Sequence, residues 1–277
     1  MLYFMKFNFK RKLAYKLIKK LHISELIRRL YPVAMDIKFE NVSQSQIVEI
    51  MRLIKVKRDE SFQLIRLGSL YDGGYLVVND FSLRDILVSL GIGDNADFEY
   101  NISTRIESII AFDHTVDSIP NMSSNTQFNK LGVKAKSVNE FVTLTSIIKD
   151  IPEKNDLLLK IDIEGSEWEV LDSMSDKELT RFRQIIGEFH GFNEETNFET
   201  INRVLGKILR NFVVVHTHAN NWGQYEIIKR IAVPDVIEIT FMRKDTESVF
   251  TNEVKNQIAA LNSRNNPSDL DLGFNLL

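Results

Sequence analysis

The feature that most constrains the fold is an alternation of short apolar runs and helical segments, which begins near residue 62. The apolar runs are rich in β-branched residues, as buried strands are. We predict strands at Leu64–Leu67, Tyr75–Val78, Ile86–Leu90, Ser108–Phe112, Leu157–Ile161, Gln184–Phe189, Phe212–His216 and Val236–Met242. We predict helices at about 96–106, 138–150, 165–181 and 196–210. Strands that alternate with helices form a parallel sheet covered on both faces, so the sequence predicts a three-layer α/β fold.

Three of the predicted strands carry further expectations. Leu64–Leu67 and Tyr75–Val78 flank the turn sequence 71–74, Tyr-Asp-Gly-Gly, which predicts a hairpin. The run Val236–Met242 alternates apolar residues with more polar ones such as Glu238, a pattern typical of an edge strand.

The first 30 residues differ from the rest of the chain in charge. They carry nine Lys or Arg and one acid, Glu25, whereas the remaining residues have a net charge of −11. We therefore divide the chain into a basic helical arm, 1–40, and a catalytic domain, 41–277, which begins with a helix predicted at 43–58. Leu13, Leu17 and Leu21 share one helical face. The arm is expected to lie on a membrane surface, to pack on its own domain or to mediate self-association.

Composition excludes several classes of protein. There is no cysteine, so disulfides, zinc–thiolate sites and cysteine nucleophiles are ruled out. The acidic catalytic domain is a poor partner for nucleic acid phosphates. Lys and Arg interrupt residues 6–20, which argues against a signal peptide, and no run approaches the ~20 apolar residues of a membrane span. We expect a cytoplasmic protein.

A first functional pattern follows the predicted strand Ile86–Leu90. It ends in Gly91-Ile92-Gly93, and glycines there let the backbone turn sharply and approach a ligand closely. The next strand ends at Asp113, 20 positions beyond Gly93, where an acid would meet ribose hydroxyls. A plain strand–helix turn with a solvated acid is the alternative. A nicotinamide dinucleotide is also permitted, although the third glycine of that fingerprint is missing.

A second pattern follows Leu157–Ile161, which runs directly into Asp162, Glu164 and Glu167. Acids at a helix start complement the helix dipole, so capping alone accounts for some of them. Asp162, however, ends a central strand, and ligands bind at that rim of an α/β sheet.

An ordered series of segments resembles the FkbM-like methyltransferases. The segment 160–171, KIDIEGSEWEVL, resembles the hallmark segment of that family. Further matching segments are Arg66–Gly68 with Asp72–Tyr75, Ser89–Gly93, Glu188–Gly191 and His216–Asn221, so the resemblance spans about 62–243. One departure is that Asp94 and Asn95 follow Gly93, where further small residues are more usual.

The resemblance implies a Rossmann-like class I methyltransferase fold with an N-terminal helical extension and S-adenosylmethionine as methyl donor. The residues expected to bind the donor are Asp72, Tyr75, Gly91, Gly93, Asp113 and Asp162. Family members commonly methylate hydroxyl groups. We therefore expect an O-methyltransferase acting on a carbohydrate or surface-glycan precursor of the capsule or lipopolysaccharide type. The alternatives are a nicotinamide-dependent oxidoreductase and a non-catalytic nucleotide-binding domain.

Histidines and acids at several strand ends are expected to converge on one rim. They are Asp162, Glu188, His190, His216 and His218. We predict His190, His218 and Asp162 as catalytic residues, because an imidazole with a pKa of ~6.5 suits a general base. Alternatively, Asp162, Glu188, His190 and His218 bind Mn²⁺ or Mg²⁺. Local hydrogen bonding without chemistry is the remaining interpretation. Trp222 is placed to stack on a sugar face.

Overall fold

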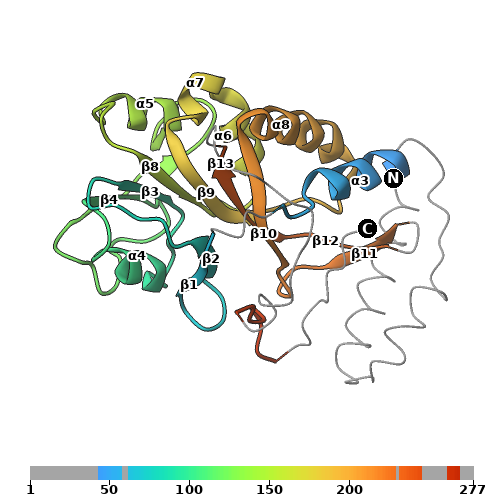
Figure 1. Cartoon of the computed structure of the whole chain (residues 1–277), viewed down its shortest axis with the longest axis horizontal. Coiled ribbons are helices and arrows are strands. Elements are labelled where there is room, and N and C mark those ends of the chain that lie inside the picture. The colour runs from blue at the N-terminus through green and yellow to red at the C-terminus, as the bar shows by residue number, and fades with distance from the viewer. Residues whose placement is uncertain (1–42, 58–61, 229–230, 245–260, 269–277) are drawn as a thin grey trace.

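A seven-stranded sheet forms the centre of the computed structural model, which describes residues 43–57, 62–228, 231–244 and 261–268 (Figure 1). Its strand order is β10-β13-β9-β8-β3-β4-β5. The strands are β3 Ile86–Leu90, β4 Ser108–Phe112, β5 Thr126–Asn129, β8 Leu157–Ile161, β9 Phe182–Phe189, β10 Phe212–Ala219 and β13 Ile237–Arg243. Three two-stranded pairs accompany it: β1 Leu64–Gly68 with β2 Gly74–Val78, β6 Gly132–Val133 with β7 Phe141–Val142, and β11 Tyr225–Ile228 with β12 Ile231–Pro234.

Helices and a hairpin cover the two faces of the sheet (Figure 1). One face packs against α3 Ser43–Leu53, α5 Leu144–Lys149, α6 Glu167–Ser173, α7 Asp176–Leu179 and α8 Phe198–Asn211. The other face packs against α4 Asp97–Ile102 and the β1–β2 hairpin. The predicted three-layer Rossmann-like α/β fold is therefore confirmed for the described residues. The arm, 1–40, lies outside them.

The central strands form where the sequence predicts them because each is a continuous apolar run. All five residues of β3 and of β8 are buried, as in a sheet covered on both sides. β3 pairs in parallel with β4 on one side and β8 on the other. The chain order reverses at β3, so the carboxyl ends of these three strands open onto the crevice where such sheets bind ligands.

The prediction that Val236–Met242 forms an edge strand is wrong. β13 lies between β10 and β9 and is antiparallel to both. Its polar residues Glu238 and Thr240 are buried because the β1–β2 hairpin and the segment 261–268 cover that face. Alternation within the strand therefore reflects two different covered faces rather than one exposed face.

Other predicted elements differ in detail. The helix expected at 165–181 is two helices, because Met174 is extended and Ser175 begins a capping box with Glu178. The helix expected at 43–58 ends at Leu53. β5 and β6 lie where no strand was predicted, and β7 occupies the first part of the helix expected at 138–150, which begins only at Leu144.

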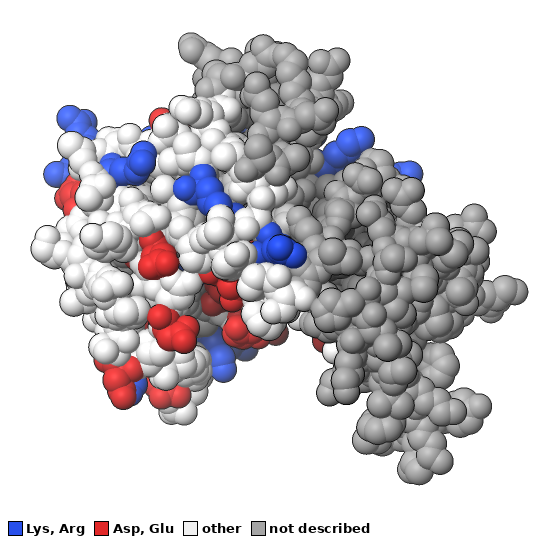
Figure 2. All heavy atoms as spheres, turned by 90° about the horizontal axis from the view of Figure 1, so that it is seen from below, with Lys and Arg blue, Asp and Glu red and all other residues white. Residues whose placement is uncertain are grey.

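Both signs of charge occur on the described surface. On the face shown in Figure 2, most acidic side chains gather on one half and most basic side chains on the other. Within the described ranges, no helix combines the length and the apolar character that crossing a bilayer requires.

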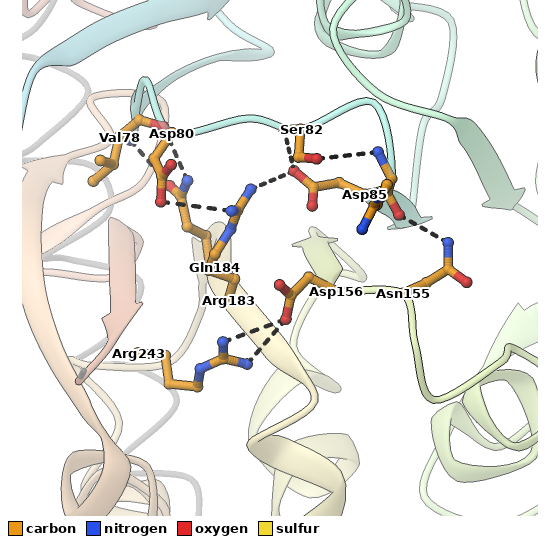
Figure 3. A network of polar contacts seen from close by, with 10 residues as sticks. Val78, Asp80, Ser82, Asp85, Asn155, Asp156, Arg183, Gln184 and Arg243 are labelled. Carbon is orange, nitrogen blue, oxygen red and sulfur yellow. Dashed lines mark hydrogen bonds and ion pairs between the residues drawn. The ribbon is translucent and has the colours of Figure 1, made fainter. Parts of the chain in front are cut away.

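Polar contacts between strands fix the hairpin on the sheet. Gln184 of β9 is fully buried, donates to the carbonyl of Val78 at 2.9 Å and accepts from its backbone N–H at 3.0 Å (Figure 3). Thr240 Oγ1 of β13 donates to the carbonyl of Leu76 at 2.5 Å. At the amino ends of the strands, Arg183 pairs with Asp85. These contacts place the turn of the hairpin beside the carboxyl ends of β3 and β8.

Candidate active site

The loop after β3 is shaped by two glycines and one carboxylate. Gly91 and Gly93 have φ of +74° and +60°, a region that favours glycine. A Cβ on Gly91 would overlap the carbonyl oxygen of Asp162, so only glycine fits there. Asp113 Oδ2 accepts from the backbone N–H groups of Ile92 and Gly93, both at 2.8 Å.

Asp113 is therefore an organiser of this loop. Its other oxygen accepts from the backbone N–H and hydroxyl of Thr115, at 2.7 and 2.6 Å. Burial acts to raise the pKa of Asp113, but these hydrogen bonds outweigh it and hold the pKa below its ordinary value. The carboxylate is thus ionised. Its contact with ribose hydroxyls stays a prediction.

The turn of the β1–β2 hairpin is held from two sides. The Arg66 guanidinium donates to the carbonyls of Ser69 at 3.1 Å and Tyr71 at 2.9 Å. Asn95 Nδ2 donates to the carbonyl of Asp72 at 3.0 Å. Asn95, one of the two residues that depart from the family resemblance, therefore ties the hairpin turn to the loop after β3. This bond holds Asp72 close to that loop.

A cavity of about 490 Å³ lies between the hairpin turn and the strand ends, and we call it the glycine-loop cavity. All six residues predicted to bind the donor line it: Asp72, Tyr75, Gly91, Gly93, Asp113 and Asp162. Val133 and Phe141 add an apolar wall from β6 and β7, which sequence reasoning did not predict. Lys160, from the hallmark segment, also lines the cavity and donates to the carbonyl of Gly91.

Asp162, Glu188 and His190 form an acid–imidazole cluster at the rim of this cavity. One oxygen or nitrogen atom from each lies within 4.8 Å of those from the other two. Tyr75 donates to Asp162 Oδ2 at 3.3 Å, and Asn220 Nδ2 donates to Glu188 Oε2 at 2.8 Å. Asp162 Oδ1 is buried and has no hydrogen-bond partner among the described residues.

Burial and mutual charge shift the pKa values of all three groups. Burial raises the pKa of Asp162 to about 6, although Lys160 and His190 act in the opposite direction. Burial also raises the pKa of Glu188 well above its usual range, and the charge of Asp162 adds to this effect. Burial therefore favours the protonated form of both carboxyl groups.

The expectation of a histidine base with a pKa of ~6.5 needs correction for His190. Burial alone would lower its pKa, but Glu167, Asp162 and Glu164 outweigh burial and raise it to about 9. Nδ1 lies 3.3 Å from Glu167 Oε1, and Nε2 lies 3.6 Å from Glu164 Oε2. His190 is therefore an imidazolium at neutral pH.

His218 lies outside the cluster, contrary to the predicted four-residue metal set. Its Nδ1 is 3.5 Å from Glu238 Oε2, and β13, which carries Glu238, separates β10 from β9. His216 likewise turns to another partner, with Nε2 2.9 Å from Asn262 Oδ1. Of the five residues expected at one rim, only Asp162, Glu188 and His190 therefore meet. The reason is that β13, which the sequence did not place here, lies between β10 and β9.

Two buried residues beside the site were missed. Glu238 is 2% exposed, and Asn265, from the chain beyond the resemblance, is 1% exposed. Asn265 Nδ2 lies 2.5 Å from Glu238 Oε1 and 3.5 Å from Asp72 Oδ1. The sequence does not predict their burial, because Glu238 is a polar residue in a strand expected at the edge of the sheet and Asn265 follows the last predicted element.

Solved structures of low sequence identity resemble the overall fold. An rRNA methylase from Streptococcus thermophilus is 12% identical, with 76% of this chain and 100% of that chain covered and a TM-score of 0.36. A Streptococcus mutans protein solved with SAH is 13% identical, with 74% and 100% covered and a TM-score of 0.32. The N-methyltransferase NodS from Bradyrhizobium japonicum is 8% identical, with 73% and 96% covered and a TM-score of 0.32.

Family membership comes from a separate comparison. No curated protein matches the chain. The family model for the methyltransferase FkbM domain matches residues 77–216, half of the chain. This range contains the loop after β3, Asp113, the hallmark segment and the acid–imidazole cluster, in the order expected from the resemblance. The chain therefore belongs to the FkbM methyltransferase family.

Proposed function

We propose that this protein transfers a methyl group from S-adenosylmethionine to a hydroxyl of a carbohydrate or surface-glycan precursor. One observation carries the proposal: Asp162 belongs both to the wall of the glycine-loop cavity and to the acid–imidazole cluster. A donor in the cavity would therefore lie beside groups that take protons. The family match sets aside a nicotinamide-dependent oxidoreductase.

The residues around the glycine-loop cavity fit this donor. Gly91 leaves the backbone free of a Cβ where the chain passes closest to Asp162, and Val133 and Phe141 offer an apolar surface to a nucleobase. Asp72 and Tyr75 add polar groups to the cavity lining. Bound S-adenosylmethionine supplies an electrophilic methyl group. The protein's own task is to align the acceptor hydroxyl and to remove its proton.

Two versions of proton removal are open. Asp162, with a pKa of about 6, is ionised at neutral pH and accepts the proton directly, while the His190 imidazolium offsets its charge. In the other version, Asp162, Glu188 and His190 hold Mn²⁺ or Mg²⁺, which lowers the pKa of the hydroxyl. The unpartnered Asp162 Oδ1 fits a cation, and the mixed oxygen and nitrogen donors of the cluster favour Mn²⁺.

Trp222 supports a saccharide as the acceptor. It is 57% exposed, although its backbone N–H is held by Asn220 Oδ1 at 2.8 Å. The same Asn220 side chain donates to Glu188 Oε2, so the backbone that carries this ring is anchored to a residue of the acid–imidazole cluster. A large ring that is exposed on an ordered loop suits stacking against the apolar face of a sugar.

The direct test is transfer of a labelled methyl group from S-adenosylmethionine to a panel of nucleotide sugars and lipid-linked glycan precursors, with and without EDTA. If a metal acts, EDTA abolishes transfer, Mn²⁺ restores it, and Glu188→Gln weakens Mn²⁺ binding about tenfold or more. The matched control is Glu169→Gln, an exposed position on α6. If Asp162 is the base, EDTA is harmless and kcat/KM rises with pH to an inflection near 6.

Two outcomes would overturn the proposal. Failure to bind S-adenosylhomocysteine in calorimetry removes the donor, and full activity of both Asp162→Asn and His190→Ala removes the cluster from the chemistry. Donor binding without transfer to any member of the panel favours a non-catalytic binding domain.

A further inference from the structure

The segment Leu261–Ser268 lies outside the matched family domain, yet it joins several parts of the site. Asn262 Oδ1 lies 2.9 Å from His216 Nε2. The backbone N–H of Asn266 donates to Asn221 Oδ1 at 2.6 Å, and Asn221 Nδ2 donates to the carbonyl of Asn266 at 3.1 Å. The segment is thus bonded to the end of β10 and to the loop that carries Trp222.

Asn265 makes the contact that links the two sides of the site. Its Nδ2 donates to Glu238 Oε1 at 2.5 Å on the sheet and faces Asp72 Oδ1 at 3.5 Å on the hairpin turn. An amide nitrogen carries two N–H groups, so one side chain can serve both carboxylates. Glu238 is buried, whereas Asp72 is accessible because it lines the glycine-loop cavity.

Without this amide, two carboxylates would face each other with no donor between them. Burial raises the pKa of Asp72, and the negative charge of Glu238 raises it further, whereas the bond from Asn265 acts to lower it. Repulsion between the carboxylates would push the hairpin turn away from β13. Such a movement would displace Asp72 and Tyr75, which form one wall of the glycine-loop cavity.

We infer that Asn265 is a positioning residue of the donor site, which holds the hairpin turn against the sheet by bonding Asp72 and Glu238 together. The inference rests on the proposed function, because it takes the glycine-loop cavity to be the donor site. It assigns Asn265 a part in the donor site, although the matched family domain ends at residue 216.

The test is calorimetric binding of S-adenosylhomocysteine to the full chain between pH 5.5 and 8.5. Asn265→Asp replaces the amide by a carboxyl, which donates a hydrogen bond when protonated and repels both neighbours when ionised. We expect binding weakened about tenfold at pH 8.5, with the deficit shrinking toward pH 5.5. Asn265→Ala removes the donor without adding a charge, so its binding should be weakened less than that of Asn265→Asp at pH 8.5.

The matched control is Asn262→Asp, the same change in the same segment at a residue that contacts His216 instead. It should bind S-adenosylhomocysteine like the wild type at each pH. Melting temperatures verify that the variants are folded, and the Ala variant provides the test if the Asp variant is not.

The results separate the two claims. A wild type that binds no S-adenosylhomocysteine sinks the proposed function. A wild type that binds, with Asn265→Asp binding equally at pH 8.5, overturns only the role of Asn265. An equal loss at every pH for Asn265→Asp would also overturn it, because it shows structural damage rather than charge repulsion.

Discussion

At the scale of single residues, the surroundings of His190 change its protonation state at neutral pH. Trp168 Nε1 donates to its carbonyl at 2.9 Å and so helps to fix its backbone. Its ring lies between Glu167, which is fully buried, and Glu164, which is exposed. The same acids that hold the ring also keep it protonated, with a pKa of about 9. A metal at the acid–imidazole cluster would have to displace that proton, so Mn²⁺ affinity is expected to rise with pH.

The protonation of His190 predicts a pH dependence of stability. Its folded-state pKa of about 9 exceeds the unfolded value of ~6.5. Its contribution is therefore complete below pH ~6.5 and is lost as pH rises through 9. We expect His190→Gln to lower the free energy of unfolding by about 1–3 kcal/mol at pH 6 and by much less at pH 9.5. Urea unfolding at both pH values measures this, with the exposed His114→Gln as control. Equal losses at the two pH values would contradict it.

At the scale of elements, the β1–β2 hairpin is the part whose position most affects the site. It contributes Asp72 and Tyr75, but it is not part of the main sheet. Its place depends on side chains of strands far along the chain, above all Gln184, which Figure 3 shows, and Thr240. Stability of the hairpin and shape of the glycine-loop cavity are therefore linked.

Removing the Gln184 amide should loosen the hairpin. Gln184→Met keeps the volume but leaves the backbone N–H of Val78 without a partner in a buried place, while the Val78 carbonyl keeps only the N–H of Asp80. We expect a loss of about 1–3 kcal/mol in the free energy of unfolding, measured in urea, and weaker S-adenosylhomocysteine binding. Gln127→Met on β5, at an exposed position, is the matched control and should change stability by less than about 0.5 kcal/mol. Similar losses in both variants would show that the amide bonds do not matter.

At the scale of the whole molecule, the sheet, the glycine-loop cavity and the acid–imidazole cluster are all built from described residues after Ser43. The basic arm, 1–40, lies outside the described residues, and its charge is opposite to that of the rest of the chain. We propose that the arm serves attachment to an anionic membrane surface or self-association rather than methyl transfer.

Deletion of residues 1–30 tests this division of labour. We expect the truncated chain to keep its S-adenosylhomocysteine affinity and turnover within about twofold, because the site residues are unchanged. Sedimentation with vesicles of anionic lipid and analytical ultracentrifugation should show lost membrane binding or a smaller assembly. A folded, soluble truncation without turnover would instead show that the arm completes the active site.

The sequence by itself determined the features that depend on local pattern. Strands such as Ile86–Leu90 and Leu157–Ile161 have the predicted bounds, because a continuous apolar run between turn residues is sufficient to specify a buried strand. The positions of Gly91, Asp113 and Asp162 at strand ends followed from the same pattern. Parallel strands bring their carboxyl ends to one edge, so the gathering of these residues around one cavity could also be expected.

Tertiary structure alone decided the rest, because it depends on residues far apart in the chain. The insertion of β13 between β9 and β10 moved His218 away from the acid–imidazole cluster and buried Glu238. The pKa of His190 reflects Glu164, Glu167 and Asp162 packed around one ring. The part played by Asn265 depends on contacts with residues 27 and 193 positions away. Periodicity reports which face of an element is buried, but not which partner covers it or which charges it meets there.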